Sequence, residues 1–382
     1  MKKAASVEPL EPDRHRCAKV EVSINHSRDR GTTMTNVTTY GLDLAKQVFQ
    51  VHWVDADTGE IHRKRLARSE VTAFFAQAHH GVVAMEACGS AHHWGRLLHE
   101  LGHEVKLIAA QFVRPFVKTN KTDVADAQAI WEAVQRPEMR FVAMKSESQQ
   151  AVLSLHRLRA QWVKIRTMQT NQLRGLLAEF GVVVPLGWRA LLKTAAARLA
   201  DDASPVPELL RNELLEQFEA VRDATRKIAR LEQRIESWHR AEGECQRIAA
   251  VPGVGPLTAS AVVASVANAR QFRSGREFAA YLGLVPRQSG TGGRVRLLGI
   301  SKRGDEYLRT LFIHGARSVL ISHSRQHRDR PLDRWLEALL ARRPSNVVVV
   351  ALANKMARTI WALLAHARTF DPSWGRSAIA SN

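Results

Sequence analysis

Two aspartates, Asp123 and Asp126, stand three residues apart where a helical pattern begins in the segment KTDVADAQAI (121–130). On a helix these positions share one face, and like charges there cost stability unless a cation or the positive helix N-terminus compensates them. One interpretation is a cap, with Asp123 as the N-cap residue and Asp126 at the third helical position. The other is that both carboxylates help to bind a metal ion.

Two more carboxylates favour the metal. Asp43 lies inside the strand-like run YGLDLAK, where an acidic side chain among apolar neighbours is costly without a partner, and Glu86 ends the run VVAME. Four carboxylates at one site would repel one another unless they held divalent cations, and hard oxygen ligands suit Mg²⁺ or Mn²⁺. Two such ions can stabilise the attacking and the leaving oxygen in phosphodiester cleavage. These residue types therefore predict metal-dependent cleavage of a phosphodiester.

The elements that must position these carboxylates are expected to form a mixed sheet flanked by helices. Alternating runs from residue 37 predict three consecutive strands, followed by helices from Ser69 and Ser90 that alternate with strands, and then by the helix of Asp123. The order β-β-β-α-β-α-β-α is that of a ribonuclease-H-like fold. In such a sheet the first and fourth strands are neighbours, so the four carboxylates could converge on one site.

A competing metal motif is HELGH (99–103), which matches the H-E-x-x-H zinc pattern. That chemistry requires both histidines on one continuous helical face. Gly102 is expected to end the helix, which leaves His103 outside it. A zinc site is therefore disfavoured.

The composition is that of a basic, soluble globular protein. The chain has 382 residues, enough for two or three domains, and its 56 Lys and Arg against 37 Asp and Glu give a net charge of +19. The charge predicts a polyanionic partner, DNA or RNA. Three distant cysteines without a CxxC pair disfavour a disulfide framework and fit a reducing cytoplasm. The most apolar run, 347–353, is too short to span a membrane.

Four regions are expected along the chain. Apolar residues that recur at helical spacing between residues 146 and 240 predict two long helices, which form either an antiparallel hairpin or a coiled coil between subunits. The expected regions are a disordered extension (1–36), a ribonuclease-H-like metal-binding domain (37–145), a helical coiled-coil region (146–245) and a mostly helical C-terminal domain (246–382).

Seven segments in order along residues 38 to 370 resemble the DEDD transposases of the insertion-sequence 110 family, with its 1111, 902 and 116 branches and the Piv-type invertases. The segments are GLDLAK (41–46), MEACGS (85–90), KTDVADAQAI (121–130), VPGVGPLTA (251–259), FAAYLGLVPRQSGTGG (278–293), ISKRGDEYLR (300–309) and ALANKMARTIWALL (351–364).

The resemblance implies a transposase or site-specific recombinase with a RuvC-like catalytic domain, a coiled-coil middle and a C-terminal transposase domain. This enzyme would cut and rejoin donor and target DNA through a serine–DNA covalent intermediate. Ser289 falls on the family's nucleophile position, although Ser274 and Ser301 are nearby. The positions matching the family's metal ligands, for Mg²⁺ or Mn²⁺, are Asp43, Glu86, Asp123 and Asp126.

The resemblance also implies a noncoding bridge RNA that pairs with both DNAs, and a homodimer or homotetramer in which the metal domain of one subunit meets the serine of another. The protein would work in the bacterial cytoplasm, on the nucleoid when bound to DNA, and away from membranes. One alternative is a resolvase-like, metal-dependent nuclease that uses water and forms no covalent intermediate. Another is a DNA-architectural protein with degenerate sites, which four intact carboxylates disfavour.

The residues around Ser289 suit a nucleophile that attacks DNA. Its neighbours Gly290, Gly292 and Gly293 allow close approach of a backbone, and flanking arginines can neutralise phosphate and favour the alkoxide. VPGVGPLTA resembles the hairpin of helix-hairpin-helix modules, whose glycine N–H groups bind phosphate, or it is a tight turn between core helices. The expected nucleic-acid contacts are Arg287, Arg294, Arg296, Lys302, Arg303, Gly253 and Gly255.

Overall fold

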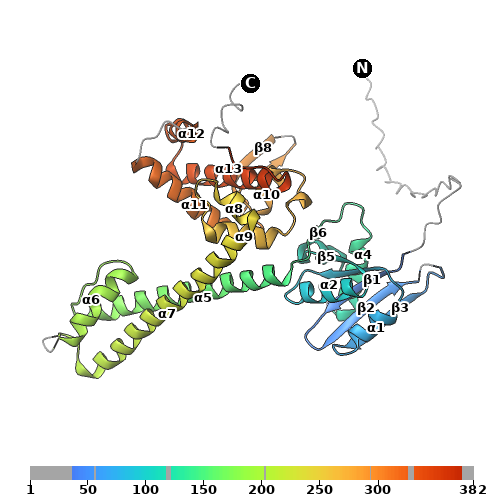
Figure 1. The fold of residues 1–382 in the computed structure, drawn as a ribbon, viewed down its shortest axis with the longest axis horizontal. Helices are drawn as coiled ribbons and strands as arrows, with labels where there is room; N and C mark the ends of the chain where they lie inside the picture. The colour runs from blue at the N-terminus through green and yellow to red at the C-terminus, as the bar shows by residue number, and fades with distance from the viewer. Residues whose placement is uncertain are drawn as a thin grey trace, which may run out of the picture. The chain divides into compact units, whose positions relative to one another are not determined.

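The computed structural model describes residues 37–371, except 56, 118–121, 202–203, 293 and 326–330. The expected N-terminal extension, 1–36, lies outside the described residues. Within them, an N-terminal α/β part is followed by two long helices and a mostly helical C-terminal part (Figure 1).

The N-terminal part is built on a mixed sheet, which has six strands among the described residues, in the order β3-β2-β1-β4-β5-β6. As expected, the first three strands form an antiparallel meander, and β1 pairs in parallel with β4. The short final strand was not expected. The strands are β1 (Thr39–Leu44), β2 (Val48–Val54), β3 (Ile61–Ala67), β4 (Val82–Glu86), β5 (Glu104–Ile108) and β6 (Phe141–Val142).

Helices cover both faces of this sheet. On one face α1 (Val71–Gln77) and α2 (Ala91–Glu100) pack against alternate apolar strand residues, among them Leu42, Phe49 and Met85. The opposite face is covered by α4 (Asp123–Val134), which follows the short α3 (Ala110–Val113) and η1 (Arg114–Phe116). Helix α1 has Glu70, one residue after Ser69, as its N-cap residue, whereas α2 begins at Ser90 as expected, with Ser90 at the N-cap position but without a side-chain hydrogen bond.

Two long helices, α5 (Glu147–Glu179) and α7 (Glu208–Ala241), lie side by side, with α6 (Trp188–Ala200) between them in the chain (Figure 1). The end of α5 packs on the start of α7 through Leu177 and Phe218, and the start of α5 packs near the end of α7. The helices are therefore antiparallel, and their apolar stripes pack within the chain.

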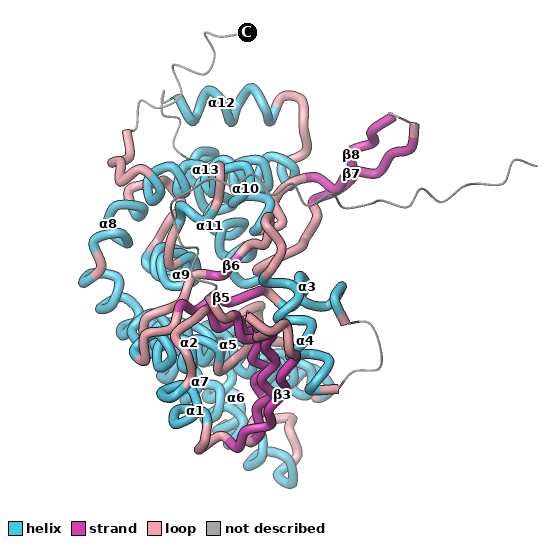
Figure 2. The backbone as a smooth tube through the Cα atoms, turned by 90° about the vertical axis from the view of Figure 1, so that its right-hand side faces the viewer, coloured by secondary structure: helices cyan, strands magenta, loops and turns pink. Residues whose placement is uncertain are grey.

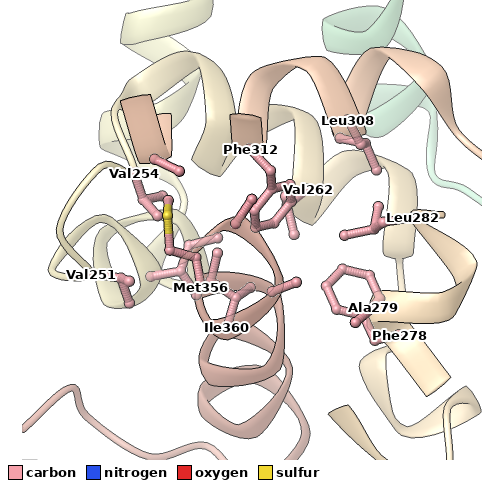
Figure 3. Close-up of a cluster of buried hydrophobic side chains, with 14 of the residues drawn as sticks. Val251, Val254, Val262, Phe278, Ala279, Leu282, Leu308, Phe312, Met356 and Ile360 are labelled. Atoms are coloured by element: carbon pink, nitrogen blue, oxygen red, sulfur yellow. The ribbon is translucent and has the colours of Figure 1, made fainter. Parts of the chain in front are cut away.

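The C-terminal part is a helical bundle around one apolar core (Figure 3). Phe278, Phe312 and Ile360 are fully or almost fully buried there. Its helices are α8 (Gly243–Ala249), α9 (Pro256–Val266), η2 (Ala269–Gln271), α10 (Gly275–Tyr281), α11 (Glu306–Arg325), α12 (Pro331–Leu340) and α13 (Ser345–Ala365).

Two features of this part differ from expectation. The Gly- and Arg-rich segment, expected as a loop, forms the hairpin β7 (Pro286–Thr291) and β8 (Arg294–Ile300), which projects from the helices (Figure 2). The apolar run 347–353 continues past Asn354 into α13, the one helix in the described residues that is long and apolar enough to cross a membrane. The argument from length was therefore wrong. Half of its most apolar window is buried inside the helical bundle.

Candidate active site

The start of α4 is capped by a threonine. Thr122 is extended, with φ −139° and ψ 150°, and its Oγ1 accepts a hydrogen bond from the N–H of Ala125 at 3.2 Å. Asp123 is the first helical residue, and Asp126 follows within the first turn. The interpretation of Asp123 as the N-cap residue was therefore wrong. Because Thr122 caps the helix, the presence of two aspartates after it needs another explanation.

The sheet and α4 bring the four carboxylates to the same end of the domain. Asp43 follows Leu42 on β1, Glu86 follows Met85 on β4, and Leu42 pairs with Met85 across these parallel strands. The indole N–H of Trp131, late in α4, donates to the carbonyl of Thr39 at the start of β1. The helix therefore runs opposite to β1, and its acidic first turn lies toward Asp43.

A glycine permits the close approach of α4 to the sheet. A Cβ atom at Gly41 would overlap the carbonyl oxygen of Ala127 and the backbone and Cβ of Trp131. The backbone of α4 thus lies directly on β1, two residues before Asp43. This contact sets the height of the helix above the sheet and hence the position of Asp126.

The pKa of Asp43 shows that the other three carboxylates are nearby. Burial is the largest cause that raises the pKa of Asp43 to about 6, and the negative charges of Asp126, Asp123 and Glu86, in that order, contribute to the same rise. The four carboxylates are therefore electrostatic neighbours around Asp43. As they stand, no three His, Cys, Asp or Glu side chains among the described residues are close enough together to hold a metal ion. A cation would fit the charge of this site, although the carboxylates as placed do not form a complete set of ligands.

The competing zinc motif is not assembled. Helix α2 ends at Glu100, and Gly102 has φ 90°, as expected for a residue that ends a helix. His103 is 1% exposed; its Nδ1 accepts from the N–H of Gly81 at 3.4 Å, and its Nε2 lies 2.9 Å from the carbonyl of Phe75. Both ring nitrogens therefore bond to the backbone.

The three candidate serines differ in their surroundings. Ser274 is the N-cap of α10, where its Oγ accepts from the N–H of Glu277 at 3.3 Å. The Oγ of Ser301 accepts from the N–H of Arg303 at 3.4 Å. Ser289 is exposed on β7, and no hydrogen bond occupies its hydroxyl among the residues that the structure describes. Two of the serines thus have structural roles, and the third is accessible.

The hairpin has two different faces. Ser289 pairs with Arg296 and Thr291 pairs with Arg294, so these four side chains share one face. The opposite face carries Val295 and Leu297, which are 64% and 63% exposed. Arg287 lies at a register shift in β7, and Gly293 lies outside the described residues.

The loop after β8 presents two of the expected basic residues. Lys302 and Arg303 are exposed, and Lys302 has a left-handed backbone with φ 54°. The N–H of Lys302 donates to the carbonyl of Gly283 at 3.2 Å, and the buried guanidinium of Arg309 donates to the carbonyl of Arg303 at 3.3 Å. Such an unfavourable backbone conformation persists only where surrounding contacts hold it.

The glycines of VPGVGPLTA form a tight turn between α8 and α9. Gly253 has φ 86°, and a Cβ there would contact the carbonyl of Gly315 on α11. Gly255 is the exposed N-cap residue of α9, with open space around it. Packing therefore accounts for Gly253, whereas Gly255 has room for a ligand.

Sequence reasoning missed two residues in register with the carboxylates. Gln50 on β2 pairs with Asp43, and Arg65 on β3 pairs with Gln50, so all three side chains lie on the face that α4 partly covers. The alternation in IHRKRLA (61–67) indicated a strand, but alternation alone does not give the pairing register.

Two family models match the chain. Residues 245–331 match the transposase IS116/IS110/IS902 family, and residues 40–181 match a second model, described as a transposase. A protein of Pseudomonas aeruginosa, named as a probable family 20 transposase, is 52% identical over 341 residues, which cover 88% of this chain and 99% of that protein.

Two further relatives are named for insertion sequences. The transposase for the element IS1111A of Coxiella burnetii is 41% identical over 350 residues, which cover 90% of this chain and 94% of that protein. The transposase for IS1328 of Yersinia enterocolitica is 39% identical over 339 residues, which cover 88% of this chain and all of that protein. By these matches over most of its length, the chain belongs to the IS110 family of insertion-sequence transposases.

Proposed function

We propose that the chain cuts and rejoins DNA through a covalent bond to Ser289, with divalent cations held by Asp43, Glu86, Asp123 and Asp126 in a ribonuclease-H-like domain. One observation carries the metal assignment: three other carboxylates raise the pKa of Asp43, although Thr122 alone caps α4. Placing like charges together costs free energy. A bound cation would offset this repulsion, which accounts for the presence of four carboxylates so close together.

The carboxylates suit Mg²⁺ or Mn²⁺ because all four offer hard oxygen ligands. When bound, such ions stabilise negative charge on the attacking and leaving oxygens of a phosphodiester. The N-terminal sheet supports the ribonuclease-H-like assignment through its strand order, in which β1 lies between the antiparallel β2 and the parallel β4.

In the proposed reaction the Oγ of Ser289 forms a bond to phosphorus while the bond from phosphorus to one deoxyribose oxygen breaks. That oxygen leaves with the electron pair and takes up a proton, and the serine proton passes to solvent. Arg296 and Arg294 share the face of Ser289 and can neutralise the phosphate, which also favours the alkoxide. The phosphoserine bond retains the energy of the phosphodiester, so the reverse attack by a DNA hydroxyl rejoins the strand.

The proposal includes a homodimer or homotetramer. Val295 and Leu297 leave an apolar face on the hairpin opposite Ser289. Where α5, α6 and α7 are joined, Val183, Leu186 and Leu209 are 85%, 83% and 94% exposed. Exposed apolar side chains of this kind suit contacts between protein subunits. A bridge RNA that pairs with donor and target DNA completes the proposal, and the net charge of +19 is compatible with binding both nucleic acids.

Removing one carboxylate tests the metal assignment. Asp123→Asn keeps the size of the side chain but removes the charge, and we expect Mg²⁺-dependent cleavage of DNA carrying the element's ends to fall roughly 100-fold or more. The exposed Glu138→Gln is the matched control and should cleave like the unmodified protein. Unchanged cleavage and unchanged Mg²⁺ dependence in Asp123→Asn would show that this carboxylate binds no essential metal.

A further inference from the structure

The strand at the edge of the N-terminal sheet carries a run of cations. In β3 the consecutive residues Arg63, Lys64 and Arg65 are all exposed, and β3 pairs only with β2 in the described sheet. Charged residues on an edge strand often prevent unwanted pairing with other chains. Alternation along the strand separates the three, however, because successive side chains point to opposite faces.

The pairing register puts the two arginines on the carboxylate face. Arg65 pairs with Gln50, which pairs with Asp43, so the three side chains form one row across β3, β2 and β1. Neighbouring strands are about 4.8 Å apart, so the backbone of Arg65 lies roughly 10 Å from that of Asp43. In the adjacent row, Arg63 pairs with His52.

The three cations have different partners. The ammonium of Lys64 lies on the other face, 4.9 Å from the centre of the Phe74 ring. Arg63 donates to the side-chain oxygen of Gln128 on α4, at a long 3.4 Å. Arg65 has no hydrogen bond or ion pair with any residue of the described part. A guanidinium beside the carboxylates is thus available to a ligand.

The neighbouring cation on the same face is already paired. Lys106 on β5 lies in the row of Ala84 and Gly41, and it forms an ion pair with Glu104 and lies over the ring of Phe141. The two sides of the carboxylates therefore differ. Toward β5 the charge of Lys106 is neutralised by an ion pair, and toward β3 the two arginines are exposed, with Arg63 hydrogen-bonded only to the neutral Gln128 among the described residues.

We propose that Arg65, assisted by Arg63, binds a backbone phosphate of the DNA strand a few nucleotides from the bond that is cut. The position of this phosphate relative to the cut rests on the proposed function, because it takes the carboxylates as the site of cleavage. Four carboxylates repel a polyanion, so a strand that reaches them needs cations nearby. A guanidinium suits this role because it binds phosphate oxygens with two parallel N–H bonds.

The salt dependence of DNA binding tests the contact itself. The full chain and Arg63→Gln/Arg65→Gln are titrated with a mixed-sequence DNA duplex in EDTA, at several salt concentrations. The slope of log K against log salt changes by about 0.9 for each phosphate contact, so the double variant should have a shallower slope by one to two such steps. Arg65→Gln alone should account for about one step.

Lys64→Gln is the matched control, since it removes the same charge from the same strand on the opposite face. It should leave the slope unchanged, and circular dichroism should show all variants folded. An equal loss of slope in Lys64→Gln, or no loss in the double variant, would overturn the proposal. Because the titration contains no divalent cation, its result is independent of whether the carboxylates bind metal or Ser289 attacks DNA.

Neutral methylphosphonates, placed one at a time along the strand that is cut, test the position. One substitution, a few nucleotides from the cut, should weaken binding to the unmodified chain and have no effect on Arg65→Gln. If the phosphate whose substitution has no effect on Arg65→Gln lies far from the cut, Arg65 does bind a phosphate, but the proposed position of that phosphate beside the carboxylates is wrong.

Discussion

At the scale of single residues, His156 connects three helices. It is 1% exposed on α5, with Nδ1 2.9 Å from the hydroxyl of Tyr307 on α11 and Nε2 3.0 Å from Oγ of Ser260 on α9. The hydroxyl of Ser260 donates to the carbonyl of Pro256 at 2.6 Å. Ser260 must therefore accept from Nε2–H, and the neutral ring accepts from Tyr307 at Nδ1.

This arrangement predicts a pH dependence of stability. Burial, together with the smaller effect of the positive charge of Arg159, lowers the pKa of His156 from 6.5 to about 4. Below pH 6.5 His156 binds a proton in the unfolded chain but stays neutral in the folded chain. The contribution of His156 to stability is therefore lost as pH falls from 6.5 toward 4. Between pH 7.5 and pH 5 this group alone should reduce the free energy of unfolding by about 2 kcal/mol.

Urea unfolding of the whole protein and of His156→Gln at both pH values measures this effect. Gln retains a donor and an acceptor but does not titrate, so the loss of stability between the two pH values should be smaller in the variant by about 2 kcal/mol. His92, whose pKa is also lowered to about 4, titrates in both proteins and cancels in the difference. Equal losses in both proteins would mean that His156 is protonated without cost in the folded chain.

At the scale of elements, the sequence predicted the strands and helices that position the carboxylates, because their apolar residues alternate or recur with clear periods. Cap identities were less predictable: Thr122 and Asp123 both suit an N-cap, and tertiary contacts decide between them. The hairpin of β7 and β8 was missed because both faces are exposed and give no alternation of burial. The convergence on Asp43 was predictable only through the strand order of a known fold.

The close contact between α4 and β1 yields a test at this scale. Gly41→Ala introduces a methyl group against the backbone of Ala127, so α4 must shift away from the sheet. We expect a loss of about 1–3 kcal/mol in unfolding free energy, together with weaker DNA cleavage, because Asp123 and Asp126 move with the helix. Gly89→Ala, at a position with open space, is the control and should change neither the unfolding free energy nor DNA cleavage. Full stability and cleavage in Gly41→Ala would show that the position of α4 is not set here.

At the scale of the whole molecule, the proposed reaction needs two sites that lie on different parts of the chain. The carboxylates are on β1, β4 and α4, and Ser289 is on a hairpin whose strands pair only with each other in the described residues. The exposed apolar side chains on that hairpin and beside α6 suit assembly of several copies. The sequence could indicate both sites, but periodicity within one chain says nothing about how copies combine.

Mixing two inactive proteins tests whether the sites meet across subunits. Asp43→Asn lacks a carboxylate and Ser289→Ala lacks the nucleophile, so neither should recombine DNA alone. If the carboxylates of one copy serve the serine of another, a mixed assembly contains one complete site, and part of the activity should return. A mixture that forms mixed oligomers but remains inactive would place both sites within one subunit.

The central claim is that Ser289 becomes covalently bonded to DNA, and mass spectrometry of the trapped adduct tests it most directly. The protein is allowed to cut DNA, denatured and digested with protease and nuclease. The account predicts a nucleotide phosphate on the peptide that contains Ser289, absent from Ser289→Ala and retained in Thr291→Ala on the same hairpin face. Cleavage that persists in Ser289→Ala, with no adduct or with the nucleotide on another residue, would contradict it.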